Sequence, residues 1–191
     1  EIMVQQAEIT WALSAARASL ARWAAAPGYY SNRLNSHLKG RLGVIAVETW
    51  LIQHGVPAIS HFRHADREAL CDIETQPQPQ AQPCRIEVKT WSAAFWPALG
   101  RCVAVAQVPA LRRKADCIVW CVVALPPAAT AKQVQRLARV AVDLVGWSTL
   151  DDVCSAPMRM TGTGNMRPVH NYQLDATMMR SMTTFVPFAH V

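Results

Sequence analysis

The stretch Arg85-Ile86-Glu87-Val88-Lys89-Thr90 decides the expected fold, because polar and apolar residues alternate along it. Successive side chains of a β-strand point to opposite faces of a sheet. Glu87 and Lys89 therefore share one face, while Ile86 and Val88 share the other. We expect a strand that packs one face on a core and presents a carboxylate beside an ammonium group on the other.

A second carboxylate precedes this strand at a spacing that lets the two acids meet. Asp72 lies in the short apolar segment Ala69–Ile73, which is typical of a strand. The following segment, Thr75–Pro83, alternates Gln and Pro, and proline at this density cannot sustain a hydrogen-bonded sheet. We expect this segment to be a flexible connection that folds the two strands into a hairpin, with Asp72 beside Glu87.

Two carboxylates on neighbouring strands suit a hard divalent cation. Asp72 and Glu87 would offer oxygen ligands to Mg²⁺ or Mn²⁺, which bind carboxylates, water and phosphate oxygens. Lys89 would orient or help to deprotonate a water molecule on the metal and offset charge on phosphorus in the transition state. The pattern predicts Mg²⁺-dependent hydrolysis of phosphodiester bonds, with Mn²⁺ able to substitute.

This arrangement resembles the PD-(D/E)XK nuclease superfamily, which includes type II restriction enzymes and Holliday-junction resolvases. The matching residues are Asp72 and Glu87-Val88-Lys89. The resemblance implies an α/β fold with a restriction-endonuclease-like core, in which a mixed central β-sheet is flanked by helices in the order αβββαβ. It also implies that Asp72, Glu87 and the Val88 carbonyl hold the metal of a DNA endonuclease.

Glu48 is the only ionisable residue in the apolar helical stretch from Gly43 to Ile52. Burying a lone carboxylate is costly unless it is paired or binds a cation. In the superfamily, a helix before the first strand often adds an acid to the metal site, which implies such a role for Glu48. Several relatives carry this Glu directly after a glycine, where this chain has Val44, and Glu48 lies one turn later. The resemblance also implies that Gln107 lies near the scissile phosphate.

A formal net charge of +6 favours association with a polyanion. Two basic groups are candidates for contacts with the phosphates of duplex or branched DNA. One leads into the Glu48 helix and comprises Lys39 and Arg41; the other precedes an apolar run and comprises Arg112, Arg113 and Lys114.

The length and patterning indicate one nuclease domain over residues 1–191. We divide it into an N-terminal helical extension (1–34), a catalytic core (35–125) and C-terminal helix and strand additions (126–191). Helical spacing predicts one extra N-terminal helix from Ile2 to about Ala26, a helix over Asn35–His54 and a helix over Thr130–Ala141. Further expected elements are strands at Ala58–Phe62, Cys117–Leu125 and Val142–Trp147, and an irregular helical segment at Ala93–Val108, interrupted near Pro97.

Localisation and the remaining reactive residues follow from composition. The chain shows neither an apolar run long enough to cross a bilayer nor the order of a secretion signal, so we expect a cytoplasmic protein without membrane contact. Its six cysteines form no CxxC pair and are expected to be reduced core residues. The spacing of His61 and His64 resembles a ligand pair, although such histidines are more often at the surface or hydrogen-bonded.

Other readings of the same residues stay open. On an exposed strand, Glu87 and Lys89 would be only a solvated pair of little energetic value. A catalytically inactive nucleic-acid-binding or assembly protein with the same fold, and a ribonuclease, are the alternative functions. A homodimer is compatible with a site that cuts one strand at a time.

Overall fold

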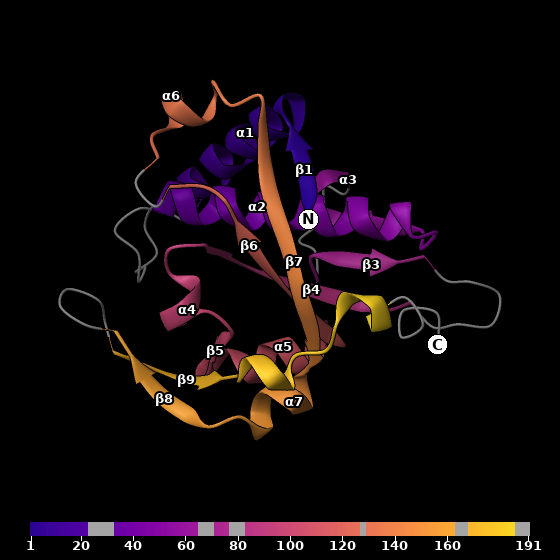
Figure 1. Cartoon of the computed structure of the whole chain (residues 1–191), viewed down its shortest axis with the longest axis vertical. Helices are drawn as coiled ribbons and strands as arrows, with labels where there is room; N and C mark the ends of the chain where they lie inside the picture. Colours follow the sequence, from indigo (N-terminus) through magenta and orange to yellow (C-terminus); the bar gives the residue numbers. More distant parts are fainter. Residues whose placement is uncertain (23–32, 65–70, 77–82, 127–128, 163–167, 186–191) are drawn as a thin grey trace.

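The alternating segment around Glu87 forms a strand, β4 (Arg85–Ser92), inside a six-stranded sheet (Figure 1). The computed structural model describes residues 1–22, 33–64, 71–76, 83–126, 129–162 and 168–185. The strand order across the sheet is β1 (Ile2–Gln5), β7 (Arg139–Thr149), β6 (Cys117–Val123), β4, β3 (Ile73–Thr75) and β2 (Ala58–Ser60). Neighbours pair antiparallel except β4 and β6, which are parallel, so the sheet is mixed.

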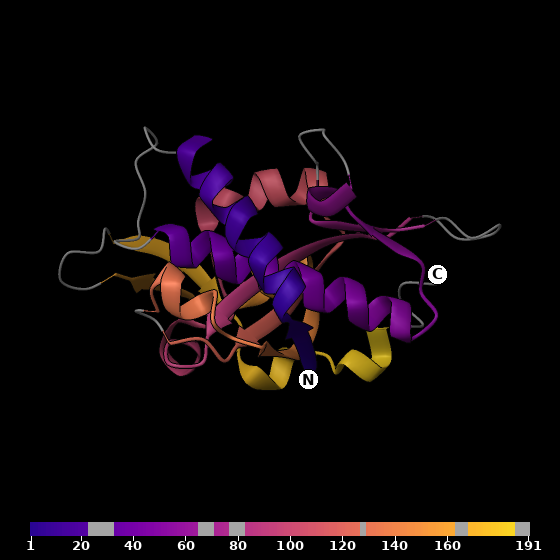
Figure 2. The same cartoon turned by 90° about the horizontal axis from the view of Figure 1, so that it is seen from above.

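Helices cover both faces of this sheet. The long helices α1 (Gln6–Arg22) and α2 (Arg33–Gln53) pack side by side over one face (Figures 1 and 2). The other face carries α5 (Val108–Lys114) and α7 (Leu150–Ser155), together with a small sheet in the order β5 (Cys102–Ala104), β9 (Val169–Gln173) and β8 (Met158–Thr161). The shorter elements are α3 (His61–His64), α4 (Trp96–Leu99) and α6 (Ala131–Val134), with 3₁₀ turns η1 (Val105–Gln107), η2 (Ala176–Met178) and η3 (Met182–Thr184).

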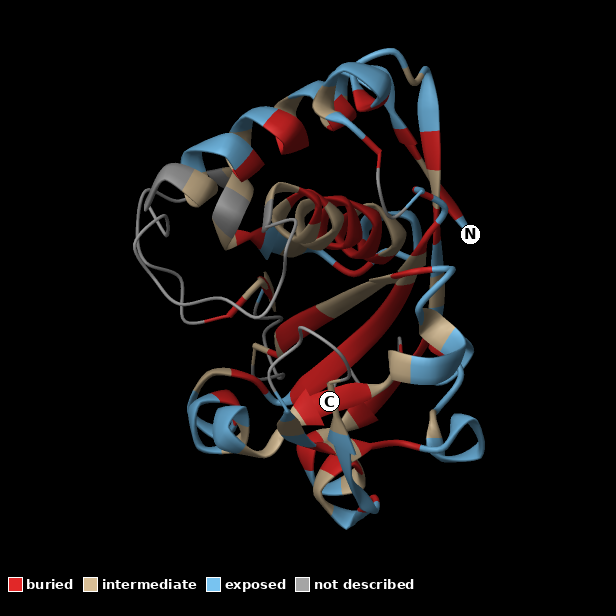
Figure 3. Cartoon of the chain, turned by 90° about the vertical axis from the view of Figure 1, so that its left-hand side faces the viewer, coloured by how far each residue is buried: buried red, intermediate tan, exposed pale blue. Residues whose placement is uncertain are grey.

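The buried strand β6 separates two cores. Its odd-numbered residues, such as Val119, pack with α1 and α2, whereas Ile118 and Trp120 pack with α5 and α7. Figure 3 shows the central strands buried between these layers and the outer turns of the helices exposed. Since Glu87 pairs in register with Ile118 and Lys89 with Trp120, both polar side chains lie on the face opposite α2.

The expected α/β class with a mixed central sheet flanked by helices is confirmed. From α2 to β6 the principal elements follow one another as helix, three antiparallel strands, helix and parallel strand. Within the described residues, none of the helices is long and apolar enough to span a membrane.

Two predicted helices are present but wrong in extent. Ile2–Gln5 is not the start of the N-terminal helix but an edge strand, because Ile2 and Val4 alternate into the core and pair with β7. The predicted helix Thr130–Ala141 ends after one turn at Val134, and β7 starts at Arg139. There Val140 and Val142 pair with β1, and the strand also hydrogen-bonds β6, so sheet formation outweighs local helical spacing.

Other predicted elements differ in extent. The helical segment expected at Ala93–Val108 contains α4, with Pro97 in its first turn, then the strand β5, which pairs with β9, and then the 3₁₀ turn η1 before α5. The strand expected at Ala69–Ile73 starts only at Ile73, with Asp72 just before it. Residues 65–70, and 77–82 of the predicted connection, lie outside the described residues, as does the predicted end of the first helix at 23–26.

Gly43 lets α2 approach β4 closely. A Cβ atom at this position would overlap the Thr90 hydroxyl group and lie 3.1 Å from Thr90 Cβ and 3.2 Å from Val88 Cγ1. By contrast, a Cβ atom at Gly40, one turn earlier, would meet nothing within 4 Å. The packing therefore requires glycine at position 43, whereas glycine at position 40 is only tolerated.

We predict that Gly43→Ala lowers the free energy of unfolding by about 1–3 kcal/mol, because the added methyl group overpacks the contact with β4. Gly40→Ala on the same helix should instead raise it by up to about 1 kcal/mol, since alanine favours helix. Urea denaturation of both variants and the wild type measures the difference. Equal effects of the two substitutions would contradict the close packing of α2 on β4.

Candidate functional site

Asp72 is attached to β4 by two hydrogen bonds. Its main-chain N–H donates to the Ile86 carbonyl at 3.1 Å, and its carboxylate Oδ2 accepts from the Val88 N–H at 2.8 Å. The N–H and C=O of one strand residue face the same edge of the strand. The Val88 carbonyl therefore faces the edge at which the Asp72 carboxylate lies.

Glu87 lies between these two anchoring residues and is buried. Its Oε1 atom is 2.6 Å from Lys89 Nζ, and its Oε2 atom is 2.6 Å from Lys114 Nζ. Lys114 is the last residue of α5. The Oε2 contact is an ion pair without hydrogen-bond geometry, and this buried oxygen has no hydrogen-bond partner within the described residues. Two acids and two lysines thus meet on one face of β4.

The pKa values of the two acids are shifted in opposite directions. Burial raises the pKa of Asp72 to about 6, and repulsion from Glu87 adds to this, against the opposing effects of the Val88 N–H and both lysines. Burial alone would raise the pKa of Glu87 too, but Lys89 and Lys114 outweigh burial and lower that pKa. Without a cation, Glu87 is the charged partner of the pair and Asp72 is the acid that takes up a proton first.

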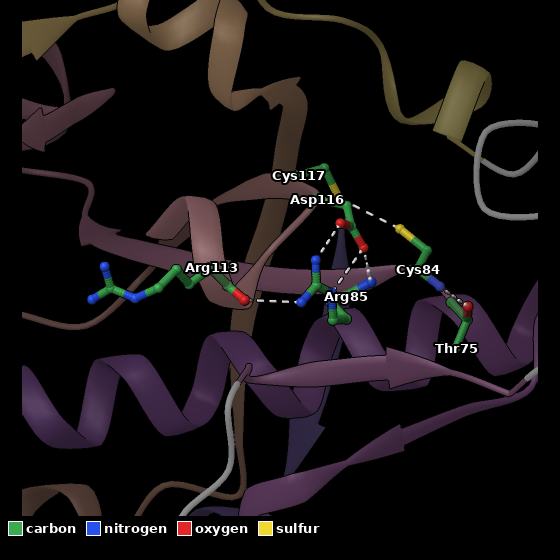
Figure 4. A network of polar contacts seen from close by, with 6 residues as sticks. All are labelled: Thr75, Cys84, Arg85, Arg113, Asp116 and Cys117. Atoms are coloured by element: carbon green, nitrogen blue, oxygen red, sulfur yellow. Dashed lines mark hydrogen bonds and ion pairs between the residues drawn. The ribbon is translucent and has the colours of Figure 1, made fainter. Parts of the chain in front are cut away.

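A second polar network fixes Lys114 beside Glu87. Figure 4 shows Arg85, the first residue of β4, reaching Asp116 in front of β6: Nη2 and Oδ1 are 2.7 Å apart, and the Arg85 main-chain N–H donates to Oδ2 at 2.8 Å. Arg85 Nη1 also donates to the Arg113 carbonyl at 2.9 Å. These contacts tie the end of α5 to the start of β4, which places the Lys114 side chain over Glu87.

Glu48 is buried in α2, as its apolar surroundings suggested, and it is paired there. Oε1 accepts a hydrogen bond of 2.9 Å from the Ser60 N–H, and Oε2 pairs with Arg63 Nη1 at 2.9 Å. The neighbouring N–H of His61 donates to the main-chain oxygen of Asp72. Glu48 thus holds the end of β2 to which the Asp72 backbone is bonded, which is a positioning role, and its predicted part in metal binding stays a prediction.

The arginines and the lysine that were predicted to contact phosphate before β6 and in α2 have different surroundings. Lys114 belongs to the acid cluster, whereas Arg112 pairs with the exposed Asp151 at 2.8 Å and Arg41 donates to Ser19 of α1. The Arg113 guanidinium is exposed and points away from the Arg85–Asp116 pair (Figure 4).

The remaining two predicted site residues are Lys39 and Gln107. Lys39 is partly buried in α2, and this burial lowers its pKa. Gln107 is exposed in η1, immediately before α5. Its predicted place near a phosphate group stays a prediction.

Sequence reasoning placed Lys114 among surface contacts and missed its approach to Glu87. One signal was present: Lys114 ends the segment before a wholly apolar strand, and such a strand is typically buried and paired in parallel. A strand parallel to the one carrying Glu87 would start at the same end, which brings the residue before it close to Glu87.

The cluster offers hard oxygen ligands: the Asp72 carboxylate and the Val88 carbonyl at one edge of β4, and Glu87 Oε2 on the adjoining face. Such a set suits Mg²⁺ or Mn²⁺ better than a soft metal. Comparisons of the chain with protein-family models, curated proteins and solved structures found no match. The interpretation of this cluster therefore rests on its geometry and chemistry.

The raised pKa of Asp72 predicts a pH-dependent stability of the metal-free protein. An acid whose pKa is raised by folding stabilises the fold when protonated, and this contribution is lost as the pH rises from about 3.8 to about 6. Asp72→Asn should therefore raise the free energy of unfolding at pH 8, by on the order of 1–2 kcal/mol, and have little effect at pH 4.

Asp116→Asn is the matched control, because Arg85 outweighs burial and lowers the pKa of Asp116. The charged Asp116 carboxylate stabilises the fold above the ordinary pKa of aspartate, and this contribution is lost as the pH falls. Asp116→Asn should therefore be destabilised at pH 8. Thermal unfolding at both pH values in EDTA compares them. If both substitutions destabilise equally at pH 8, Asp72 does not carry the repulsion described above.

Glu48→Gln should separate positioning from metal ligation. The amide can still accept from the Ser60 N–H but loses the ion pair with Arg63, so we expect a loss of about 1–3 kcal/mol in the free energy of unfolding. We expect its affinity for Mg²⁺, measured by calorimetry on the folded variant, to stay within about threefold of the wild type. Glu87→Gln should lose Mg²⁺ binding. A Glu48→Gln protein that is stable but does not bind Mg²⁺ would instead show that Glu48 is a metal ligand.

Proposed function

We propose that this protein is a divalent-metal-dependent nuclease with a restriction-endonuclease-like core that hydrolyses DNA phosphodiester bonds. The observation that carries the proposal is the hydrogen bond from the Val88 N–H to the Asp72 carboxylate. It brings a second acid to Glu87 at the edge of β4, with Lys89 on the same face. Acids from two segments and an adjacent amine form the constellation that metal-assisted phosphodiester hydrolysis needs.

The order of elements supports the same proposal. The run from α2 through β2, β3, β4 and α5 to β6, with antiparallel pairs first and a parallel pair last, agrees with the αβββαβ order that the sequence resemblance implies. The positions of the acids support it too, with Asp72 just before the second strand and Glu87 in the third.

Asp72, Glu87 and the Val88 carbonyl would hold the metal. The buried Glu87 Oε2, which lacks a directed hydrogen bond within the described residues, fits a cation ligand. When bound, Mg²⁺ would polarise a phosphate oxygen and lower the pKa of a water molecule, and Mn²⁺ can replace it. Charge supports this assignment: burial and then repulsion from Glu87 raise the pKa of Asp72, and a divalent cation between the two acids would relieve that repulsion.

Lys89 and Lys114 would bind the substrate side of the site. A cation on Glu87 competes with the two ammonium groups, whose N–H groups then become available to phosphate oxygens. Lys89, on the same strand face as Glu87, would hold the attacking water or stabilise negative charge that develops on the phosphate. Arg113 is exposed next to Lys114 and would add a phosphate contact without sequence information.

A second candidate is a nucleic-acid-binding protein without turnover. One observation favours it: both carboxylate oxygens of Glu87 already lie 2.6 Å from a lysine, so the acid is neutralised without any metal. Under this reading, the cluster is a partly buried ion-pair network that holds α5 on the sheet.

Lys89→Ala tests the proposed activity directly. With Mg²⁺, the wild type should convert a plasmid, or single-stranded or branched DNA, to cut products, and the variant should be slower by at least about 100-fold. DNA binding measured without metal should fall only slightly and stay salt-sensitive in both proteins. Lys132→Ala, an equal charge loss on the exposed surface of α6, should cut like the wild type.

Equal cleavage by Lys89→Ala and Lys132→Ala would contradict the role of Lys89. Wild-type protein that binds DNA but leaves every DNA form intact with Mg²⁺ or Mn²⁺ would favour the non-cleaving alternative. Cleavage of RNA alone would keep the mechanism and change the substrate.

A further inference from the structure

A second cluster of ligand-type side chains comes from residues close to Asp72 in the sequence and in the β2–β3 pair. It consists of His61, Cys71 and Glu74, whose donor atoms all lie within 4.8 Å of one another. His61 Nε2 is 3.0 Å from Glu74 Oε2. Cys71 is buried, whereas His61 and Glu74 are partly exposed, with 25% and 37% of their side-chain surface accessible. The cluster therefore has one closed side and one side open to solvent.

The backbone that carries these three side chains is fixed by the sheet. Glu74 lies in β3 and pairs in register with Ile59 of β2. His61 directly follows β2, and its N–H donates to the main-chain oxygen of Asp72, the residue after Cys71. The ladder between β2 and β3 thus sets the spacing of the three donors.

The donor set is that of a borderline or soft metal. An imidazole, a thiolate and a carboxylate favour Zn²⁺ and related transition metals over Mg²⁺, which takes oxygen ligands. Tetrahedral zinc, with bonds of about 2.0–2.3 Å, spaces its ligand atoms roughly 3.3–3.7 Å apart. The imidazole and carboxylate would need to separate slightly, and the sulfur to approach them by up to roughly 1.5 Å.

We propose that His61, Cys71 and Glu74 form a transition-metal site of the Zn²⁺ class, with a fourth position open to water. This site is separate from the oxygen-ligand site at Asp72 and Glu87, and it does not depend on the nuclease proposal. The bound ion would join β2, β3 and the segment that leads into Asp72.

Charges and protons around the site balance on binding. Burial, and then the charges of Glu74 and Asp72, raise the pKa of the Cys71 thiol to about 11, so the metal-free thiol carries its proton, which passes to solvent when the metal–sulfur bond forms. His61 gives up its contact with Glu74 and binds through Nε2. Arg85 is the nearby cation that would oppose a metal, and its charge is offset by Asp116 at 2.7 Å.

Titration of the full chain with Co²⁺, under reducing conditions and without other metals, tests this proposal. The wild type should bind one equivalent with a thiolate-to-cobalt charge-transfer band in the near ultraviolet, and Zn²⁺ should displace it. Cys71→Ser should lose the band. Glu74→Gln, at a partly exposed position that leaves the fold intact, should keep a weaker band with affinity lowered about 10- to 100-fold.

Two control variants make the outcomes decisive. Cys154→Ser, at the partly exposed cysteine of α7, should keep the wild-type band and affinity. Asp72→Asn should also keep the band, although it removes a proposed Mg²⁺ ligand. No charge-transfer band in the wild type, a band that survives Cys71→Ser, or Co²⁺ binding that Glu74→Gln leaves unchanged would each overturn the proposal. Loss of the band in Asp72→Asn would show that the two sites are not separate and would also overturn the proposal.

Discussion

The hydrogen bond between the Val88 N–H and the Asp72 carboxylate is the contact on which the candidate site depends. β3 pairs with β4 only at Ile86 and Arg85, so the β4 edge beyond Ile86 is without a strand partner in the described ladder. The Asp72 side chain takes the place of that partner at 2.8 Å. A carboxylate is thereby held at a strand edge next to Glu87, although burial and like charge disfavour it there. Such unfavourable pairing is typical of sites that bind a cation or transfer a proton.

The parallel pairing of β4 with β6 explains how the opposing charges reach the acids. A parallel connection must carry the chain back to the same end of the sheet, here through the segment that includes α5. Lys114, the last residue of α5, therefore lies over Glu87. The Arg85–Asp116 pair, drawn in Figure 4, fixes this position. The lysines lower the pKa of Glu87 against the effect of burial. The fold thus holds two acids together in the absence of metal, and the raised pKa of Asp72 leaves this acid partly protonated.

The sequence predicted those parts of the fold that local periodicity determines. Alternation defined β4 and the shared face of Glu87 and Lys89, and an unbroken apolar run defined β6. Periodicity failed at Ile2–Gln5 and Arg139–Val142, because these segments become strands by pairing with each other and, around Val142, with β6. The partner of Glu48 was beyond prediction, because Arg63 approaches it through tertiary packing rather than through spacing along the chain. For Lys114, only the apolar run of β6 pointed to its approach to Glu87.

The central claim is that a divalent cation binds between Asp72, Glu87 and the Val88 carbonyl. Anomalous diffraction from crystals of the wild-type protein soaked in Mn²⁺ tests it most directly. We predict a peak with oxygen atoms of Asp72, Glu87 and Val88 at about 2.0–2.3 Å, and with Lys89 and Lys114 displaced from at least one Glu87 oxygen. A map without a peak at this edge, with both lysines still on Glu87 at saturating Mn²⁺, would contradict the account.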